Sequence, residues 1–232
     1  MTGPSLPFRR RRDPAPEPRD VMLARLRQGG IVDARVLDSM ARVPREEFVT
    51  EGFEGAAYDD RALPIGYRQT ISQPLMVAHM LQALEMKGGE RVLDVGTGSG
   101  YQAALISAMG ASDVVSIERI DRLADVARRR FERLGYPIEV VVGDGSKGVP
   151  GMGTFDRIVV GAVAPSPPRS LLEELNPSGL LVIPLRWERV AGGDERLVRF
   201  RRLEAPDGPR FAHEDLGPCR FVPLVGSEGY DE

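Results

Sequence analysis

Apolar residues in the second half of the chain follow strand spacing and helical spacing in turn. Short apolar runs predict strands at residues 92–95, 114–117, 138–142, 158–160 and 180–183. Helical spacing between these runs predicts helices at residues 102–108, 122–134 and 168–175. Strands that alternate with helices favour a parallel sheet covered on both faces. The pattern therefore predicts an α/β, Rossmann-like doubly wound sheet.

The regions flanking this body have other patterns. Helical spacing predicts helices at residues 21–28, 34–41 and 74–86, the last with Ser72 just ahead of it as a candidate N-cap. Residues 43–73 hold no sustained period and predict an ordered loop. At the other end, residues 196–203 and 220–225 predict strands. Because the turn-rich residues 205–217 leave no room for a crossover helix, we expect an antiparallel C-terminal hairpin at the sheet edge.

These patterns divide the chain into three parts. We expect a disordered tail over residues 1–20, an N-terminal helical segment over 21–87 and a Rossmann-like core over 88–232. The tail carries a basic run at residues 9–12, but Asp13 and a proline-rich stretch follow it in place of the apolar segment of a signal peptide. We interpret the run as solvated, with a basic anchoring arm as the alternative.

Composition narrows the class of protein. The chain has 232 residues, of which 42% are hydrophobic and 28% charged, which is typical of a globular domain. It contains no run of about 20 apolar residues, so we expect no membrane span. A net charge of −3 supplies no basic field for nucleic acid. Cys219 is the single cysteine, which excludes an intrachain disulfide and a thiolate metal cluster and favours the cytoplasm.

A glycine-rich turn after the first strand of the body is the main chemical signal. It reads Asp94-Val95-Gly96-Thr97-Gly98-Ser99-Gly100, and its glycines let the backbone approach a ligand closely. A dinucleotide fingerprint would require glycine where the chain has Tyr101, and the Gly-Lys-Ser/Thr ending of a P-loop is absent. Pyrophosphate is therefore not the expected ligand.

Acidic residues end three successive predicted strands. Asp94 begins the turn, Glu118 ends the second strand, and Asp144-Gly145 follows the third. One carboxylate in such a set can bind ribose hydroxyls, another can accept from an adenine amino group, and Asp94 can attract a cationic amino acid. The set suits an uncharged nucleoside joined to a sulfonium amino acid, which is S-adenosylmethionine. The alternative is that all three carboxylates only cap helices.

Several stretches resemble one family of methyltransferases. Residues 92–101, VLDVGTGSGY, resemble the first motif of class I methyltransferases, and specifically of the protein-L-isoaspartate O-methyltransferases. Residues 58–66 and 69–74 resemble the substrate-facing segment of that family, which is far more selective than a glycine turn. The match continues through residues 142–145, 155–158 and 220–226. It covers nearly all of the chain after the expected tail.

The resemblance implies a reaction and a set of site residues. It implies methyl transfer from S-adenosylmethionine to the free carboxylate of L-isoaspartyl residues in damaged proteins or peptides, giving an ester that collapses through a succinimide. The implied catalytic residue is Ser72. The implied cofactor-binding residues are Ile71, Asp94, Gly96, Thr97, Gly98, Glu118, Asp144 and Gly145. The implied substrate-binding residues are Ile65, Thr70 and Ser72, and no metal site is expected.

The expected chemistry needs no general base. A carboxylate with a pKa near 4 is already ionised at neutral pH, and neither His79 nor His213 lies in a catalytic motif. Alignment and exclusion of water can supply roughly 7–11 kcal/mol. The Ser72 hydroxyl, with the free N–H groups of the helix start behind it, can hold the acceptor carboxylate without losing its proton. The alternative role for Ser72 is an N-cap worth ~1 kcal/mol. Asp59 or Asp60 either positions the loop or belongs to a surface turn.

Four residues depart from the bacterial branch of the family. Leu75 stands where an aromatic residue or histidine is common, Gly161 replaces a usual threonine, and Arg186-Trp187 replace a more typical glycine. They leave acceptor choice open, with Trp187 either at a pocket rim or in ordinary packing. Methylation of aspartate in a dedicated peptide partner and a non-catalytic adaptor remain alternatives, whereas Tyr101 disfavours a nicotinamide dehydrogenase. We expect a monomer.

Overall fold

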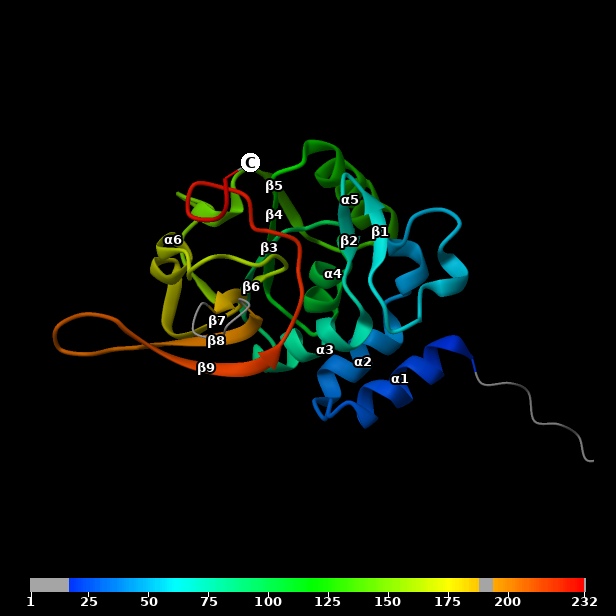
Figure 1. Ribbon diagram of the computed structural model, residues 1–232, viewed down its shortest axis with the longest axis horizontal. Coiled ribbons are helices and arrows are strands. Elements are labelled where there is room, and N and C mark those ends of the chain that lie inside the picture. The colour runs from blue at the N-terminus through cyan, green and yellow to red at the C-terminus, as the bar shows by residue number, and fades with distance from the viewer. Residues whose placement is uncertain (1–16, 188–193, 232) are drawn as a thin grey trace, which may run out of the picture.

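The computed structural model describes residues 17–187 and 194–231, and a seven-stranded sheet lies at its centre (Figure 1). The strand order is β5-β4-β3-β6-β7-β8-β9. The strands are β3 (Arg91–Val95), β4 (Asp113–Glu118), β5 (Glu139–Val142), β6 (Phe155–Val160), β7 (Leu175–Trp187), β8 (Asp194–Leu203) and β9 (Arg210–Pro218). The first five in this order pair in parallel, and β8 and β9 are antiparallel. The predicted fold class is confirmed.

The chain reverses direction across the sheet at β3. Helices α4 (Tyr101–Ala108) and α5 (Asp121–Leu134) lead outward from β3 to β4 and β5. The chain then returns to the other side of β3 with β6, and α6 (Arg169–Glu173) precedes β7. In open parallel sheets, ligands bind at the carboxyl ends of the strands beside such a reversal. The fold therefore places a binding crevice at the end of β3.

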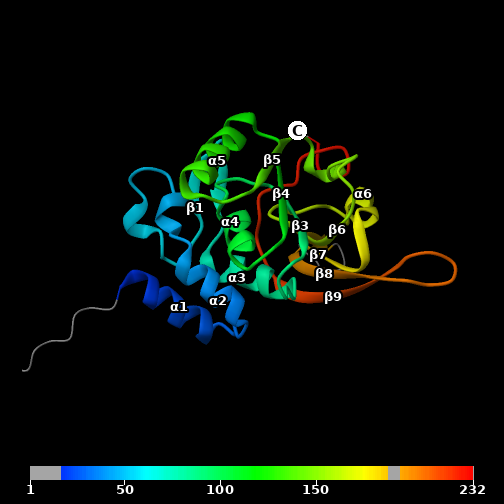
Figure 2. The ribbon, with the colours of Figure 1, turned by 180° about the vertical axis from the view of Figure 1, so that it is seen from behind.

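Alternate strand residues supply the two cores that lie on opposite faces of the sheet. Val92 and Val114 are buried in a cluster with residues from α1 to α5, whereas their neighbours Leu93 and Val115 are buried in a second cluster with Leu171 of α6. This is the period of two expected for strands with both faces covered. Figure 2 shows the sheet and the helices that pack on it from behind. Burial of each such side chain contributes roughly 1.5–3 kcal/mol.

The N-terminal part packs as helices and a small hairpin against the sheet domain. Its elements are α1 (Pro18–Gln28), α2 (Ala34–Arg42), the 3₁₀ helices η1 (Arg45–Phe48) and η2 (Glu54–Ala56), β1 (Leu63–Gly66), β2 (Gln69–Ile71) and α3 (Pro74–Ala83). Helix α1 begins with a proline, whose fixed φ suits the first helical position. Residues 18–20, which were expected to belong to the disordered tail, are therefore part of this helix. The rest of that tail up to residue 16, with its basic run, lies outside the described residues.

Residues 43–73 contain more regular structure than their pattern predicted. Strands β1 and β2 pair antiparallel, but with four and three residues they are too short to show a period, and β1 contains Pro64, which is unusual in a strand. The prediction of Ser72 as the N-cap of α3 was wrong. Gln73 holds that position without a side-chain cap, because the helix begins at Pro74.

The second C-terminal strand was predicted at the wrong residues. It is β9 at Arg210–Pro218, where the predicted turn lay, and not residues 220–225. Most β9 side chains are exposed, so its sequence is polar, as suits an edge strand. Residues 221–225 are apolar and pack across the strand ends. There the Val163 N–H donates to the Val222 carbonyl at 2.8 Å, and the Leu224 N–H donates to the Val163 carbonyl at 2.7 Å. None of the helices in the described ranges is long and apolar enough to cross a membrane.

Candidate active site

The turn between β3 and α4 packs tightly on α5. Gly96, Gly98 and Gly100 all have positive φ angles, of 92°, 51° and 88°. At Gly100 a methyl group would also lie 2.7 Å from the ring of Phe131, which is buried. Glycine is therefore required there by both conformation and space.

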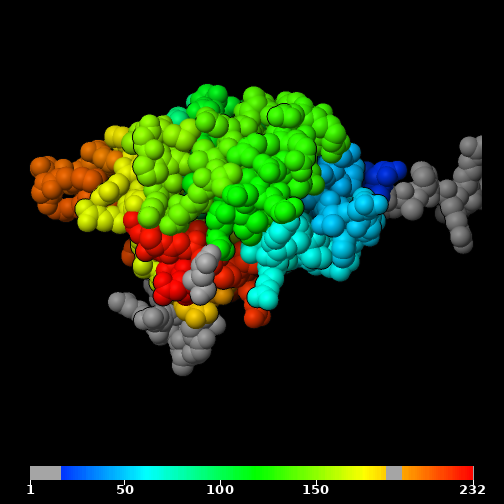
Figure 3. Space-filling model, turned by 90° about the horizontal axis from the view of Figure 1, so that it is seen from above, coloured from blue at the N-terminus to red at the C-terminus, as the bar shows by residue number. Residues whose placement is uncertain are grey.

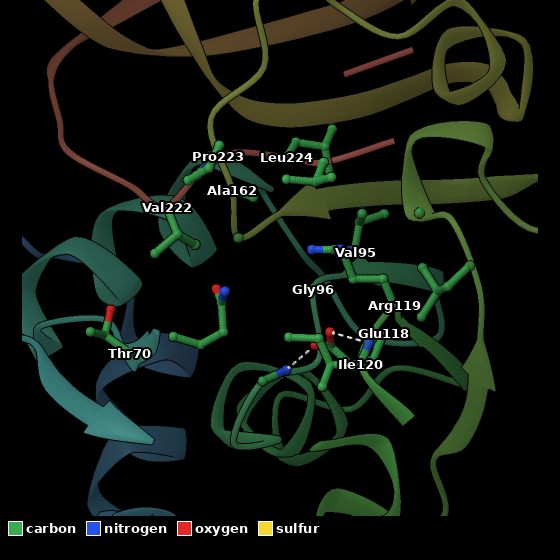
Figure 4. A pocket seen from close by; sticks show the side chains of 16 residues that line it. Thr70, Val95, Gly96, Glu118, Arg119, Ile120, Ala162, Val222, Pro223 and Leu224 are labelled. Carbon is green, nitrogen blue, oxygen red and sulfur yellow. Dashed lines mark hydrogen bonds between the residues drawn. The ribbon is translucent and has the colours of Figure 1, made fainter. Parts of the chain in front are cut away.

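Glu118 holds this turn from the end of β4. Its Oε2 accepts from the backbone N–H of Gly98 at 2.9 Å, and its Oε1 accepts from the N–H of Ile120 at 3.0 Å (Figure 4). Glu118 lines a cavity beside the turn. One edge of the cavity therefore has a fixed acceptor group.

This first cavity lies at the carboxyl ends of β3, β4 and β6, as the reversal of the sheet at β3 predicted. Its lining combines the turn, the ends of β2, β4 and β6, and the C-terminal segment: Gln69, Thr70, Val95, Gly96, Gly98, Ile117, Glu118, Arg119, Ile120, Gly145, Gly161, Ala162, Val222, Pro223, Leu224 and Val225. The lining combines apolar side chains such as Ile117, Ile120 and Leu224 with the polar Gln69 and Thr70 and the charged Glu118 and Arg119. Apolar surface beside a carboxylate suits a flat nucleoside whose hydroxyls need an acceptor. The predicted cofactor residues Gly96, Gly98, Glu118 and Gly145 lie in this lining.

Asp94 does not face this cavity, contrary to the expectation of direct contact with the ligand. It is fully buried, and its carboxylate accepts from Nε2 of Gln102 at 2.8 Å and from the Ser116 hydroxyl at 2.7 Å. Burial raises the pKa of Asp94 to about 6, against the two hydrogen bonds, and the nearby Glu118 adds to the rise. Asp94 therefore joins β3, β4 and α4 beneath the turn.

Asp144 also differs from its expected role. Its Oδ1 accepts from N–H and hydroxyl of Ser146 at 3.0 and 2.6 Å, and its Oδ2 accepts from N–H and hydroxyl of Ser227 at 2.9 and 3.1 Å. Burial favours a higher pKa, but these bonds hold the pKa of Asp144 below its ordinary value. The carboxylate anchors the C-terminal segment and lines an adjoining cavity, while Gly145 faces the first one.

Three other predicted residues lie around the turn without lining the first cavity. The Thr97 hydroxyl bonds the Ser116 hydroxyl at 2.6 Å and is buried. Ile71 is buried in the first core cluster. Ile65 packs beside Gly98, where an added methyl group would lie 3.3 Å from its Cδ1. These side chains support the turn and the β1–β2 hairpin.

A second cavity of about 410 Å³ adjoins the first. Its lining is Ala62, Thr70, Ser72, Gln73, Met76, Gly161, Arg220, Phe221 and Val222. Thr70, Gly161 and Val222 line both cavities, so the two are contiguous. Figure 3 shows the C-terminal segment in red and the β1–β2 region in cyan reaching the same face of the molecule. The predicted substrate residues Thr70 and Ser72 meet here.

Arg45 fixes the backbone at Ser72 through a hydrogen bond. Its Nη2 donates to the Ser72 carbonyl at 2.6 Å, its Nε donates to the Ala57 carbonyl at 2.7 Å, and its guanidinium lies 4.7 Å from the centre of the Tyr101 ring. Arg45 is fully buried, and this burial lowers its pKa although Tyr101 opposes the shift. Nothing in the sequence pattern pointed to this residue.

The two aspartates of the loop have different roles. The Asp60 carboxylate accepts from the Leu75 N–H at 2.9 Å, in the first turn of α3, so it positions the loop against the helix. Asp59 forms an exposed ion pair with Arg61 at 3.2 Å. A carboxylate at a helix N-terminus also stabilises the helix dipole.

Sequence reasoning missed the contribution of the C-terminal segment, because its apolar residues resembled a strand. Arg220 and residues 222–225 line the two cavities. Trp187 ends β7, but its side chain is outside the described residues. Across the described residues, no group of three or more His, Cys, Asp or Glu side chains could hold a metal ion.

Comparison with known proteins assigns the chain to a family. Residues 17–229 match the family model described as protein-L-isoaspartate(D-aspartate) O-methyltransferase. A protein-L-isoaspartate O-methyltransferase of Aeropyrum pernix is 46% identical over 225 residues, which cover 95% of this chain and 84% of the relative. A protein-L-isoaspartate O-methyltransferase of Brucella anthropi is 45% identical over 212 residues, which cover 91% of this chain and 94% of the relative.

Solved structures agree with these relatives. A structure named protein-L-isoaspartate O-methyltransferase superposes with a TM-score of 0.80 at 26% identity, covering 91% of this chain and 67% of the other. One from Plasmodium falciparum, described as a protein-L-isoaspartate O-methyltransferase in complex with S-adenosyl-L-homocysteine, has a TM-score of 0.74 at 25% identity and covers 89% and 98%. The chain belongs to the protein-L-isoaspartate(D-aspartate) O-methyltransferase family.

Proposed function

We propose that this protein transfers a methyl group from S-adenosylmethionine to the free carboxylate of L-isoaspartyl residues in damaged proteins or peptides. The ester then collapses through a succinimide, which starts repair. The observation that carries the proposal is the junction of the two cavities at Thr70, Gly161 and Val222. One cavity suits the nucleoside of a methyl donor, and the other holds Ser72. A methyl group and its acceptor can therefore meet at the junction.

The first cavity fits the donor chemically. The donor supplies an electrophilic methyl group on a sulfonium. We assign Glu118 to the ribose hydroxyls, because its carboxylate lines the cavity, and Gly96, Gly98 and Gly145 to close backbone approach. Asp94 and Thr97 act by holding the turn. A donor bound in this cavity displaces water from the reacting groups.

The second cavity fits a carboxylate acceptor. We assign the Ser72 hydroxyl to donate to the acceptor carboxylate, which reacts in its ionised form and needs no base. Arg220 lines the same cavity and supplies a positive charge that favours an anionic acceptor. The hydrogen bond from Arg45 to the Ser72 carbonyl, which we call the Arg45 clamp, fixes the Ser72 backbone, so the hydroxyl is positioned before the acceptor binds.

Strand β2 is suited to a polypeptide acceptor. Pro64 pairs with Thr70, and because proline has no N–H, this must be a pair without mutual hydrogen bonds. The backbone groups of both residues then point away from the partner strand, and the Pro64 carbonyl indeed accepts from the Thr50 hydroxyl at 3.0 Å on the outer side. The N–H and carbonyl of Thr70 thus face outward at the free edge of β2, where an extended polypeptide can pair with them.

The proposal assigns the acceptor to residues 21–87 together with the C-terminal segment, and the donor to the core at 88–232. The single cysteine supports a reducing cytoplasm as the compartment. A monomer remains a prediction.

Donor binding and methyl transfer test the proposal together. Titration calorimetry should show that the protein binds S-adenosylmethionine, and mass spectrometry should show a methyl ester on an isoaspartyl peptide. Binding without transfer to any peptide would favour the adaptor, and absence of binding would overturn the assignment of the first cavity. Methylation of aspartate in a dedicated peptide is the second candidate, favoured if the aspartyl form reacts faster.

A further inference from the structure

A third cavity extends the acceptor site along α3. It has a volume of about 280 Å³ and is lined by Gln73, Leu75, Met76 and His79 on one side and by Leu197, Leu216 and Pro218 on the other. It shares Gln73 and Met76 with the acceptor cavity. The two cavities are therefore parts of one trough, which we call the α3 groove where it passes Met76.

Helix α3 lines one side of the α3 groove, and strands β8 and β9 line the other through Leu197, Leu216 and Pro218. Gln73, Met76 and His79 are three residues apart and so follow one face of α3, covering about 9 Å from Gln73 to His79. On the opposite side, the chain from Leu216 to Val222 passes from the α3 groove into the acceptor cavity. Figure 1 shows this C-terminal segment in red as it leaves β9 beside α3.

We propose that the α3 groove is a subsite for an apolar side chain of the acceptor polypeptide, two or three residues from the isoaspartate. The inference rests on the proposed function. An extended chain rises about 3.3 Å per residue, so two or three residues cover the distance of about 9 Å from Gln73, at the acceptor cavity, to His79. The subsite gives the enzyme a preference among damaged sequences.

The lining determines the class of side chain. Five of the seven lining residues are leucine, methionine or proline, and none is Asp, Glu, Lys or Arg. A leucine or phenylalanine side chain placed here leaves water for an apolar surface, whereas a charged side chain loses hydration without a partner. Bulky apolar residues are favoured and acidic ones are disfavoured.

Continuity with the acceptor cavity identifies the occupant. The groove borders the acceptor cavity at Gln73 and Met76, so a polypeptide that presents its carboxylate to Ser72 lies next to the groove. If a separate partner or a second copy occupied the groove instead, KM would not depend on the residues that flank the isoaspartate.

A peptide scan tests the subsite. In an alanine-based peptide with one isoaspartate, leucine is placed singly at each of the three positions on either side, and KM and kcat are measured. We expect leucine at one position, two or three residues from the isoaspartate, to lower KM about tenfold with little change in kcat. Aspartate at the same position should raise KM. Equal KM values throughout the series would overturn the subsite.

Two matched variants place the effect in the groove. Leu216→Asp should abolish the leucine preference, whereas Leu203→Asp, on the same hairpin but exposed and outside the groove, should keep it. Leu216→Ala, a milder change, should weaken the preference even if the aspartate variant fails to fold. A preference that persists in Leu216→Ala and Leu216→Asp would contradict the assignment. Methylation of every peptide without preference refutes only the subsite, whereas no methylation of any peptide refutes the proposed function.

Discussion

Single residues at the junction depend on partners that are distant in sequence. Ser72 is held through its carbonyl by Arg45, 27 residues earlier, and Arg45 in turn lies against Tyr101 at the start of α4. The buried guanidinium of Arg45 thus contacts both Ser72 and Tyr101, the residue that follows the glycine turn. Placing donor and acceptor accurately is the main source of rate enhancement when the nucleophile needs no activation.

Replacing Ser72 tests its assigned role most simply. Ser72→Ala removes the donor to the acceptor carboxylate, so kcat should fall by roughly a hundredfold, as for loss of one preorganised donor. The Kd for S-adenosylmethionine, measured by calorimetry, should stay the same. Ser112→Ala is the control, because Ser112 is exposed in the loop before β4, at the opposite end of the strands. Near-normal turnover in Ser72→Ala would refute the role.

Replacing Arg45 should destabilise the fold. Arg45→Met leaves the carbonyls of Ala57 and Ser72 buried without their donor, which costs roughly 1–3 kcal/mol for each group. Urea denaturation should therefore show a loss of about 2–6 kcal/mol in the free energy of unfolding. The same substitution at the exposed Arg68 should change it by less than about 0.5 kcal/mol. Equal stability of the two variants would contradict the clamp.

At the scale of elements, the turn after β3 depends on both conformation and space. Gly100→Ala and Gly89→Ala both impose a positive φ, of 88° and 90°, but only the first places a methyl group against Phe131. Gly100→Ala should be the more destabilising by about 1–3 kcal/mol, the usual cost of overpacking. Chemical denaturation of both variants measures the difference. Equal losses of stability in the two variants would show that only the positive φ, and not contact with Phe131, requires glycine at position 100.

The contribution of Asp94, which joins β3 to β4 and α4, to the stability of the fold should depend on pH. Because burial raises the pKa of Asp94 to about 6 from an ordinary value of 3.8, the folded protein binds this proton more tightly than the unfolded chain. The contribution of Asp94 to the free energy of unfolding is therefore present below about pH 4 and is lost as pH rises through 6.

The isosteric variant isolates this effect from other titrating groups. Asp94→Asn keeps the partners Gln102 and Ser116 but cannot titrate. Between pH 4 and 7 the unfolding free energy of the parent should fall by about 2 kcal/mol relative to that of the variant. Denaturation midpoints across this range measure the difference, and parallel pH profiles would contradict the raised pKa.

The sequence predicted elements well where residue patterns are strong. Strands β3, β4, β6 and β7 follow buried apolar runs, whereas β5 follows an apolar run that is half-buried to exposed. The existence and order of these strands and their helices were predicted, with boundaries that differ by a few residues. Strand β9 was missed because an edge strand is polar, and residues 220–225 were taken for a strand because their apolar side chains pack across the strand ends. Hydrophobicity reports burial, not hydrogen-bond pairing.

The site was predicted by position but not by side-chain direction. Spacing placed Glu118 and the glycines at one edge of the sheet, and they line one cavity. The same spacing could not show that Asp94 turns to Ser116, or that Asp144 holds Ser227 of the C-terminal segment. Both partners are known only once the chain has folded, since they lie 22 and 83 residues away.

At the scale of the whole molecule, one trough joins three cavities. It leads from the α3 groove past Ser72 to the glycine turn, with the C-terminal segment along its side. The two ends of the chain therefore build the acceptor side of a site whose donor side belongs to the sheet. This arrangement presents a polypeptide carboxylate to a methyl group at the junction.

Selectivity between two isomers of one peptide tests this account most directly. The purified protein is incubated with S-adenosylmethionine and either an isoaspartyl peptide or its aspartyl counterpart of the same sequence, and kcat/KM for methyl-ester formation is measured for each. The account predicts efficient methylation of the isoaspartyl peptide and none detectable of the aspartyl one. Equal rates for both isomers, or methylation of the aspartyl peptide alone, would contradict it.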